Sequence, residues 1–242
     1  MNLAANSSKT LVVVMGGTID AFYNPEHGTP HTVPVPDGPE KSCIPDALKK
    51  LGIADACEVW TYCMKDSKKI TKADLDGIVK RVENEGYNKV VVVHGTDTMP
   101  NSGLYLQDAL KDTDARVVIT GSMYPLRDAQ GQWRGLDAQA EPVLTNVIPR
   151  DVDGQIDYAR ACDGWVNLKQ AISDVQNPDL KAGVYIRVRP ESVELGDGPW
   201  HASMLSKYVI TDAPGTQVGT VQRSGFVVRS APATAQEISF NF

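Results

Sequence analysis

Residues 90–99 read VVVVHGTDTM, four valines followed by a polar loop that contains a glycine and two threonines. A short run of β-branched residues that ends in a polar loop is typical of a strand buried on both faces. Comparable runs occur at Leu11–Val14, Val117–Thr120 and Val184–Val188. The sequence therefore predicts four buried strands.

Helical patterns separate these strands. The clearest is Thr71–Glu85, where apolar residues recur at i, i+3, i+4 and i+7, and where Thr71 and Asp74 form a helix-start signal. Three further helices are expected, at Ile44–Leu51, Ser102–Lys111 and Val166–Val175. Strands that alternate with helices indicate an α/β fold, a Rossmann- or flavodoxin-like parallel sheet with helices on both faces.

Composition excludes several classes of protein. The chain is 42% hydrophobic and 22% charged, as in ordinary globular domains. A net charge of −6 would repel nucleic acid. No apolar run approaches the ~18 residues that cross a bilayer, and the first residues lack a signal-peptide pattern, so we expect a cytoplasmic protein without a membrane partner. Four scattered cysteines and four scattered histidines predict reduced thiols and neither a metal nor another cofactor.

Three stretches interrupt the alternation. Gly28–Pro39 contains four prolines and is expected to be a loop, and residues 128–161 are polar, without sustained period, and resemble an insertion. After residue 190 the helical pattern fades. We therefore expect an α/β domain over residues 1–190 and an extended or β-rich segment over 191–242, with extended pieces at Lys207–Thr211 and Gly225–Val228.

Glycine and hydroxyl residues follow three of the predicted strands, at Gly16–Ile19, His94–Met99 and Thr120–Met123. Ligands of parallel sheets bind beyond the carboxyl ends of the strands. Glycine lets the backbone approach a ligand there, and a threonine hydroxyl can act as a nucleophile if a neighbouring group activates it. The alternative is that these are ordinary turns in which Thr or Asp caps the next helix.

Taken together, the three motifs resemble the asparaginase/glutaminase family of threonine amidohydrolases. The resemblance runs from about Thr10 to Val188 and is closest to the N-terminal domain or to the short single-domain members. Further matches support it, at Lys65–Ser67, Asp163-Gly164, Asn167-Leu168 and Gly183–Tyr185.

The resemblance implies four catalytic residues. Thr18 would attack a side-chain amide and form an acyl-enzyme, and Tyr23 would hydrogen-bond Thr18 and close over the substrate. Thr96 would activate the nucleophile or the water, and Asp97 would hold the α-ammonium of the substrate. A structural role for Tyr23, as packing on the edge of the sheet, remains open.

The resemblance also implies a substrate-binding set made of Gly17, Asp66, Ser67, Gly95 and Ser122. Ser67 would contact the α-carboxylate of a small amide amino acid, and Asp66 would shape its loop. Asp66 and Ser67 are also favoured turn formers, so a purely structural turn before the next helix is the alternative. The resemblance to this family also implies a homo-oligomer.

Two departures from the family pattern bear on function. The family's triad has a lysine beyond the strand at 183–188, whereas residues 189–207 of this chain read RPESVELGDGPWHASMLSK, with Lys207 as their only lysine. Lys68 stands where larger relatives have a small amide or hydroxyl residue, and its charge would oppose a substrate ammonium. The sequence thus leaves two functions open: an amidohydrolase, or a catalytically silent relative that acts as a binding or assembly module.

Overall fold

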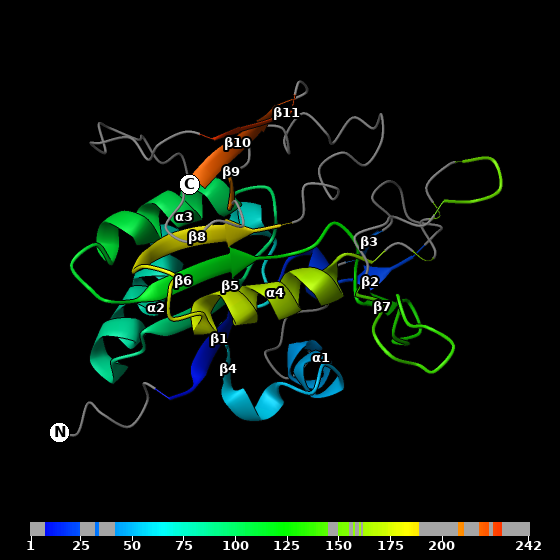
Figure 1. Cartoon of the computed structure of the whole chain (residues 1–242), viewed down its shortest axis with the longest axis horizontal. Coiled ribbons are helices and arrows are strands. Elements are labelled where there is room, and N and C mark those ends of the chain that lie inside the picture. Colours follow the sequence, from blue (N-terminus) through cyan, green and yellow to red (C-terminus); the bar gives the residue numbers. More distant parts are fainter. Residues whose placement is uncertain are drawn as a thin grey trace.

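A five-stranded parallel sheet forms the centre of the molecule (Figure 1). The computed structural model describes residues 8–24, 32–33, 42–144, 150–154, 157, 160, 162–188, 208–210, 218–222 and 225–228. The strands lie in the order β4-β1-β5-β6-β8, so the second strand of the chain in this sheet lies outside the first. Their bounds are Thr10–Val14 (β1), Cys57–Thr61 (β4), Lys89–Val93 (β5), Arg116–Thr120 (β6) and Gly183–Arg187 (β8). This order is flavodoxin-like, and the predicted fold is confirmed.

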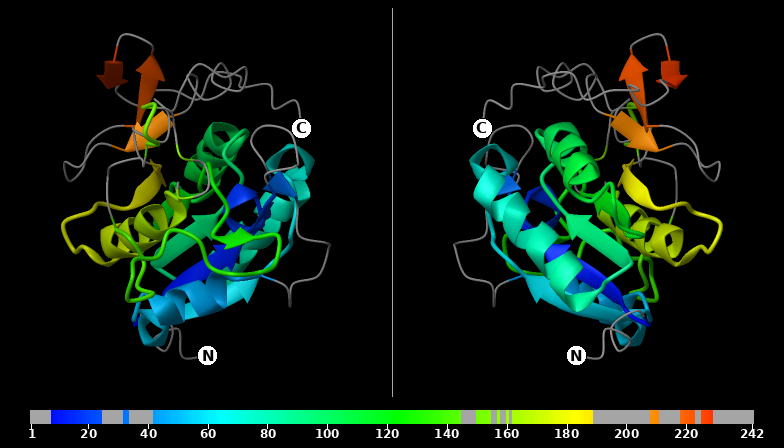
Figure 2. Two further views of the ribbon diagram at one scale, coloured as in Figure 1. Left: turned by 90° about the vertical axis from the view of Figure 1, so that its right-hand side faces the viewer. Right: turned by 90° about the vertical axis from the view of Figure 1, so that its left-hand side faces the viewer.

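Alternate residues of each strand enter two separate cores, because successive side chains of a strand point to opposite faces. In β1, Leu11 and Val13 belong to one core and Val12 and Val14 to the other, all fully buried. Figure 2 shows helices on both sides of the sheet. The first core is covered by α2 (Lys72–Glu85) and α3 (Met99–Ala109), the second by α1 (Ile44–Lys50) and α4 (Gly164–Gln176).

The ends of α2 and the start of α3 follow from residues in their local sequence. The predicted start of α2 is confirmed: the Thr71 side chain accepts from the Asp74 backbone, the Asp74 side chain accepts in return, and Gly86 ends the helix at φ 68°. The third helix, α3, starts earlier than the predicted Ser102, since Pro100 is accepted in a first helical turn, where its missing N–H has no partner to lose.

Strand β4 was not among the strands predicted from the sequence. It reads CEVWT, with polar residues between the apolar ones, and it forms one edge of the sheet with β1 as its neighbour. Its outer residues are only half-buried, and Arg81 from α2 covers them by packing 4.5 Å from the Trp60 ring centroid and pairing with Glu58 at 2.8 Å. An edge strand lacks the continuous apolar run by which the central strands were recognised.

A second small sheet lies at the end of the molecule toward which β6 and β8 point (Figure 1). It consists of β2 (Phe22–Tyr23), β3 (Thr32–Val33) and β7 (Arg127–Asp128). The expectation of a loop throughout Gly28–Pro39 is therefore wrong at β3, which pairs with β2 through backbone hydrogen bonds that need no apolar pattern. The rest of that loop lies outside the described residues.

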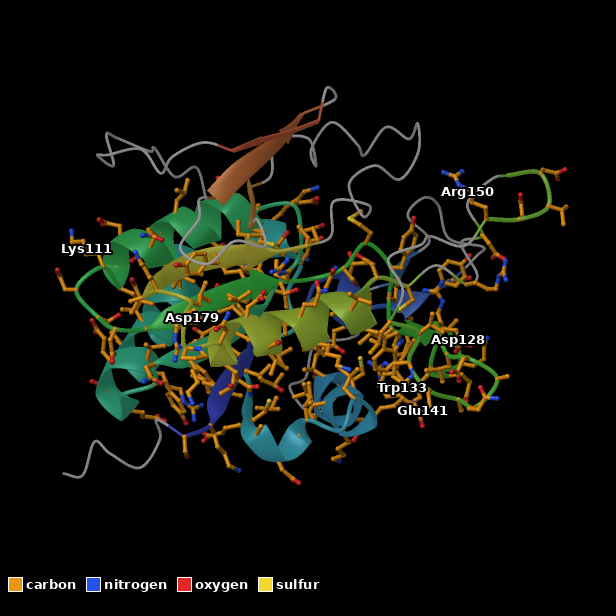
Figure 3. The ribbon with its side chains drawn as sticks, viewed as in Figure 1. Lys111, Asp128, Trp133, Glu141, Arg150 and Asp179 are labelled. Carbon is orange, nitrogen blue, oxygen red and sulfur yellow. The ribbon has the colours of Figure 1, made fainter. Side chains whose placement is uncertain are left out.

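The stretch predicted as an insertion is built, where described, from Asp-initiated turns at residues 128–131, 137–140 and 151–154. In each turn the first Asp accepts a hydrogen bond from the backbone N–H two residues later. The fourth residue has a left-handed backbone, with φ of 78°, 60° and 77° in chain order. Figure 3 shows Asp128, Trp133 and Glu141 near β7 and Lys111 and Asp179 at the opposite end. The first two turns thus lie at the carboxyl end of the sheet.

The C-terminal part contains an antiparallel sheet of β9 (Tyr208–Ile210), β10 (Val218–Gln222) and β11 (Gly225–Val228). These strands confirm the extended pieces expected in that region, while the boundary at residue 190 stays a prediction. Lys207 lies outside the described residues. No helix in the described part of the chain is long and apolar enough to cross a membrane.

Ala140 is the only non-glycine residue with a positive φ among those described, and its Cβ is strained there. We expect Ala140→Gly to raise the free energy of unfolding by about 0.5–1 kcal/mol, measured by urea denaturation. Ala138→Gly in the same turn is the matched control and should lower it by about 0.5–1 kcal/mol, since it only adds chain entropy. A less stable Ala140→Gly protein would contradict the strain.

Candidate functional site

The tips of β1 and β5 touch through two glycines. A Cβ on Gly17 would lie 2.5 Å from the Gly95 Cα, far inside van der Waals contact. Gly17 also has φ 91° and ψ −178°, a combination that is essentially restricted to glycine. Each glycine is followed directly by one of the threonines singled out in the sequence, Thr18 and Thr96. The two threonines therefore extend from backbone segments in direct contact.

The loop after β4 packs against the same two tips. A Cβ on Gly16 would lie 2.7 Å from the Lys65 backbone nitrogen, and a Cβ on Gly95 would lie 2.8 Å from the Ser67 Cβ. The Thr98 hydroxyl donates to the Ser67 carbonyl at 2.9 Å. Ser67 is 4% exposed, so its side chain is enclosed between these loops.

Lys65 ties this loop to the start of α2. Its ammonium donates to both carboxylate oxygens of Asp74, at 2.7 and 2.8 Å. Burial alone would raise the pKa of Asp74, but the hydrogen bonds from Lys65 and Thr71 outweigh it and lower the pKa. Asp66 accepts from the Lys68 backbone N–H at 2.8 Å and remains exposed, which is the turn-forming role left open for it.

The loop after β6 forms the third side of the candidate site. A Cβ on Gly121 would lie 2.3 Å from the His94 carbonyl oxygen, so β5 and β6 also need glycine to approach. Thr96 is 7% exposed, and its hydroxyl lies 3.8 Å from the Met123 sulfur. Ser122 is 1% exposed and donates to the Tyr124 carbonyl at 2.6 Å. The Ser122 hydrogen is thus used within its own loop.

Asp163, which precedes α4, and Asn167 in α4 hold the β6 loop, a role that the sequence alone did not indicate. The Asp163 carboxylate accepts from the backbone N–H groups of Met123 and Tyr124, at 3.0 to 3.2 Å. Asn167 donates to that carboxylate at 3.0 Å and to the Gly121 carbonyl at 2.9 Å. Asp163 immediately precedes α4, where an aspartate is expected to cap its own helix, but here no cap bond is made and the acceptor serves another loop.

His94 supports the β5 tip from within the core. It is fully buried, with Nδ1 2.6 Å from the Gly95 carbonyl and Nε2 2.9 Å from the Ser102 hydroxyl. A carbonyl only accepts, so in the neutral ring Nδ1 donates to it and Nε2 accepts from Ser102. The His94 ring therefore links the loop after β5 to α3.

Thr18 begins a short 3₁₀ turn, Thr18–Asp20, whose last residue is anchored in the protein interior. Asp20 is 1% exposed, accepts from the Cys43 backbone N–H at 2.7 Å and pairs with Arg127 at 3.5 Å. Thr18 itself is half-buried. The turn is therefore fixed by contacts from α1 and β7, which no local sequence signal reveals.

Tyr23 is 8% exposed and lies in β2. The Arg134 guanidinium packs on its ring, 3.9 Å from the centroid, and donates to the Pro125 carbonyl at 2.8 Å. Burial lowers the pKa of Arg134. Trp165 in α4 donates to the Arg134 carbonyl at 2.8 Å. Tyr23 thus lies beneath a residue of the stretch expected to be an insertion, and its role stays a prediction.

Asp97 is paired with a cation of its own chain. Its carboxylate lies 3.1 Å from the Lys68 ammonium, with 36% of the Asp97 side chain and 70% of the Lys68 side chain exposed. The hydrogen bond that Lys68 donates to the Asp97 carboxylate raises the pKa of Lys68. Among the described residues, no group of three or more His, Cys, Asp or Glu side chains is arranged to hold a metal ion.

We predict that Gly17→Ala lowers the free energy of unfolding by roughly 2–5 kcal/mol in urea denaturation, because its Cβ collides with Gly95 and its backbone is strained. Gly52→Ala is the matched control, since Gly52 also has a positive φ, 71°, but has open space around it. Gly52→Ala should lower the free energy of unfolding by only about 1–2 kcal/mol. Equal losses would mean that the strand tips yield to the added methyl group.

Asp163→Ala should lower the free energy of unfolding by about 2–4 kcal/mol, because it leaves buried N–H groups of the β6 loop without an acceptor. Asp137→Ala is the control: Asp137 also accepts from two backbone N–H groups, but it is exposed and water replaces it. Its loss should stay within about 1 kcal/mol. Similar losses for the two variants would contradict a buried positioning role.

Solved structures and a family model match this chain. A crystal structure of a probable cytoplasmic L-asparaginase from Campylobacter jejuni is 18% identical, with a TM-score of 0.49 over 92% of this chain and 58% of that one. The thermostable L-asparaginase of Thermococcus kodakarensis is 19% identical, with a TM-score of 0.48 over 95% of this chain and 58% of that one. Residues 9–132, just over half of the chain, match the family model described as asparaginase, N-terminal. The chain belongs to the asparaginase family.

Proposed function

We propose that the protein is an amidohydrolase of asparaginase type, which hydrolyses the side-chain amide of asparagine or a similar small amide. The observation that carries the proposal is the backbone contact between Gly17 and Gly95, the residues that directly precede Thr18 and Thr96. Family membership supports it. Assembly as a homo-oligomer and a cytoplasmic location stay predictions.

The reaction has two steps. The Thr18 hydroxyl oxygen attacks the amide carbon, the C–N bond breaks, and ammonia leaves with the hydroxyl proton. Water then attacks the ester carbon, releases the acid and returns a proton to the Thr18 oxygen. In this scheme Thr96 activates the nucleophile in the first step or the water in the second.

The strained turn at Gly17 supports the proposed role of Thr18. Backbone N–H groups at a glycine-rich strand tip can stabilise the oxyanion that forms when the carbonyl is attacked, because they are already oriented. Gly17 and Gly95 therefore serve the substrate through their backbones. Ser122, whose hydroxyl hydrogen is bonded to its own loop, offers the substrate only its oxygen.

The substrate's remaining groups meet the loop after β4. Ser67, enclosed between that loop and Gly95, is proposed to bind the carboxylate, and Asp66 sets the turn that presents it. Tyr23 is proposed to hydrogen-bond Thr18 from a ring held in place by Arg134. In this reading Tyr23 acts from a fixed position, since a buried ring under a buried guanidinium is not an exposed lid.

The test is ammonia release from asparagine and glutamine by the purified protein. Thr18→Ala should lower the rate at least ~10³-fold, since the nucleophile is lost. Thr113→Ala is the matched control, because Thr113 lies between α3 and the start of β6, at the amino end of the sheet, and its hydroxyl donates to the Leu110 carbonyl. It should retain the wild-type rate.

Ammonia release that Thr18→Ala leaves unchanged would end the proposal. No release from any amide would favour the silent relative that the sequence leaves open. Calorimetry with aspartate and asparagine would then distinguish a binding module, which takes up the ligand, from a purely structural one.

A further inference from the structure

The Lys68–Asp97 pair lies at the place where the substrate's cation is expected. Asp97 follows Thr96 at the β5 tip, and Lys68 follows Ser67 in the β4 loop, so the pair bridges the two loops of the proposed site. Nitrogen and oxygen are 3.1 Å apart. The backbone of the β4 loop is fixed here, because the Thr98 hydroxyl bonds the Ser67 carbonyl and Asp66 accepts from the Lys68 N–H.

The ammonium group of a substrate would therefore meet an Asp97 carboxylate that already pairs with Lys68. It would either displace the Lys68 ammonium or bind beside it, and two positive charges about 4 Å apart repel each other even in water. A substrate that lacks this ammonium meets no such repulsion and leaves the Lys68–Asp97 pair intact. The Lys68 ammonium thus takes the place, beside Asp97, of the ammonium group that an α-amino acid substrate would carry.

We propose that the site selects small ω-amides of carboxylic acids that carry no α-ammonium group, for which succinamic acid, asparagine without its amino group, is the simplest representative. This inference rests on the proposed amidohydrolase function and names the substrate class of that site.

Two carboxylates raise the pKa of Lys68 above its ordinary value. Asp97 contributes most through its hydrogen bond, and Asp66 adds a weaker attraction. Removal of Lys68 leaves Asp66 and Asp97 facing the loop without this cation. Such a site attracts an ammonium, which asparagine carries and succinamic acid lacks, so the substitution reverses the preference instead of merely weakening it.

The expected size of the selectivity follows from the exposure of the Lys68 side chain. With 70% of the Lys68 side chain in solvent, water screens the pair. We therefore expect selectivity of about tenfold rather than complete exclusion of asparagine. The effect should appear mainly in KM, because Lys68 acts on binding and not on the reacting bond.

The experiment measures kcat/KM for succinamic acid and asparagine on the full chain, as wild type, Lys68→Gln, Lys68→Arg and Lys69→Gln. Wild type should prefer succinamic acid by about tenfold, and Lys68→Gln should prefer asparagine. Lys68→Arg keeps the charge and should keep the wild-type preference. Lys69→Gln removes a charge from the same turn, leaves the pair in place and should do the same.

Preference of the wild type for asparagine, or a ratio that Lys68→Gln does not move, overturns the inference while leaving the amidohydrolase proposal intact. If neither amide is hydrolysed, the amidohydrolase proposal fails. Calorimetry with succinate and aspartate then tests the inference separately. Tighter binding of succinate, reversed by Lys68→Gln, supports it, and equal affinity or no binding of either overturns it.

Discussion

The close approach of backbone at Gly17 and Gly95 is the constraint on which the candidate site depends. Two neighbouring parallel strands are separated by about 4.8 Å, and their tips come closer only where no Cβ intervenes. The same condition applies at Gly16 against Lys65 and at Gly121 against His94. Glycine at these positions is thus a steric requirement of the site itself, independent of any catalytic role.

Two lysines of the β4 loop use their charges differently. Lys65 makes two hydrogen bonds to the largely buried Asp74 and fixes the loop to α2, so its charge stabilises the fold. Lys68 reaches across to Asp97 in solvent, where the pair adds little stability but sets the local charge beside the proposed nucleophile. The difference lies in exposure, because a buried carboxylate needs its partner and an exposed one does not.

The part of the chain between β6 and α4 supports the site from outside. Arg134 packs on Tyr23, and Asp163 binds the backbone of the β6 loop together with Asn167 from α4. These groups are buried and hydrogen-bonded, so they hold the loops in one arrangement. A stretch without any helical or strand period therefore contributes to the rigidity of the site.

The sequence by itself determined the central strands, the four helices and the glycine-threonine tips, because each is encoded by local periodicity or by a short motif. It did not reveal β4, whose edge position removes the apolar run, or β3, which depends on pairing alone. It also could not show that Asp163 serves the β6 loop or that Lys68 neutralises Asp97. Those pairings join residues far apart in the chain, and only the order of strands and the packing of loops bring them within hydrogen-bonding distance.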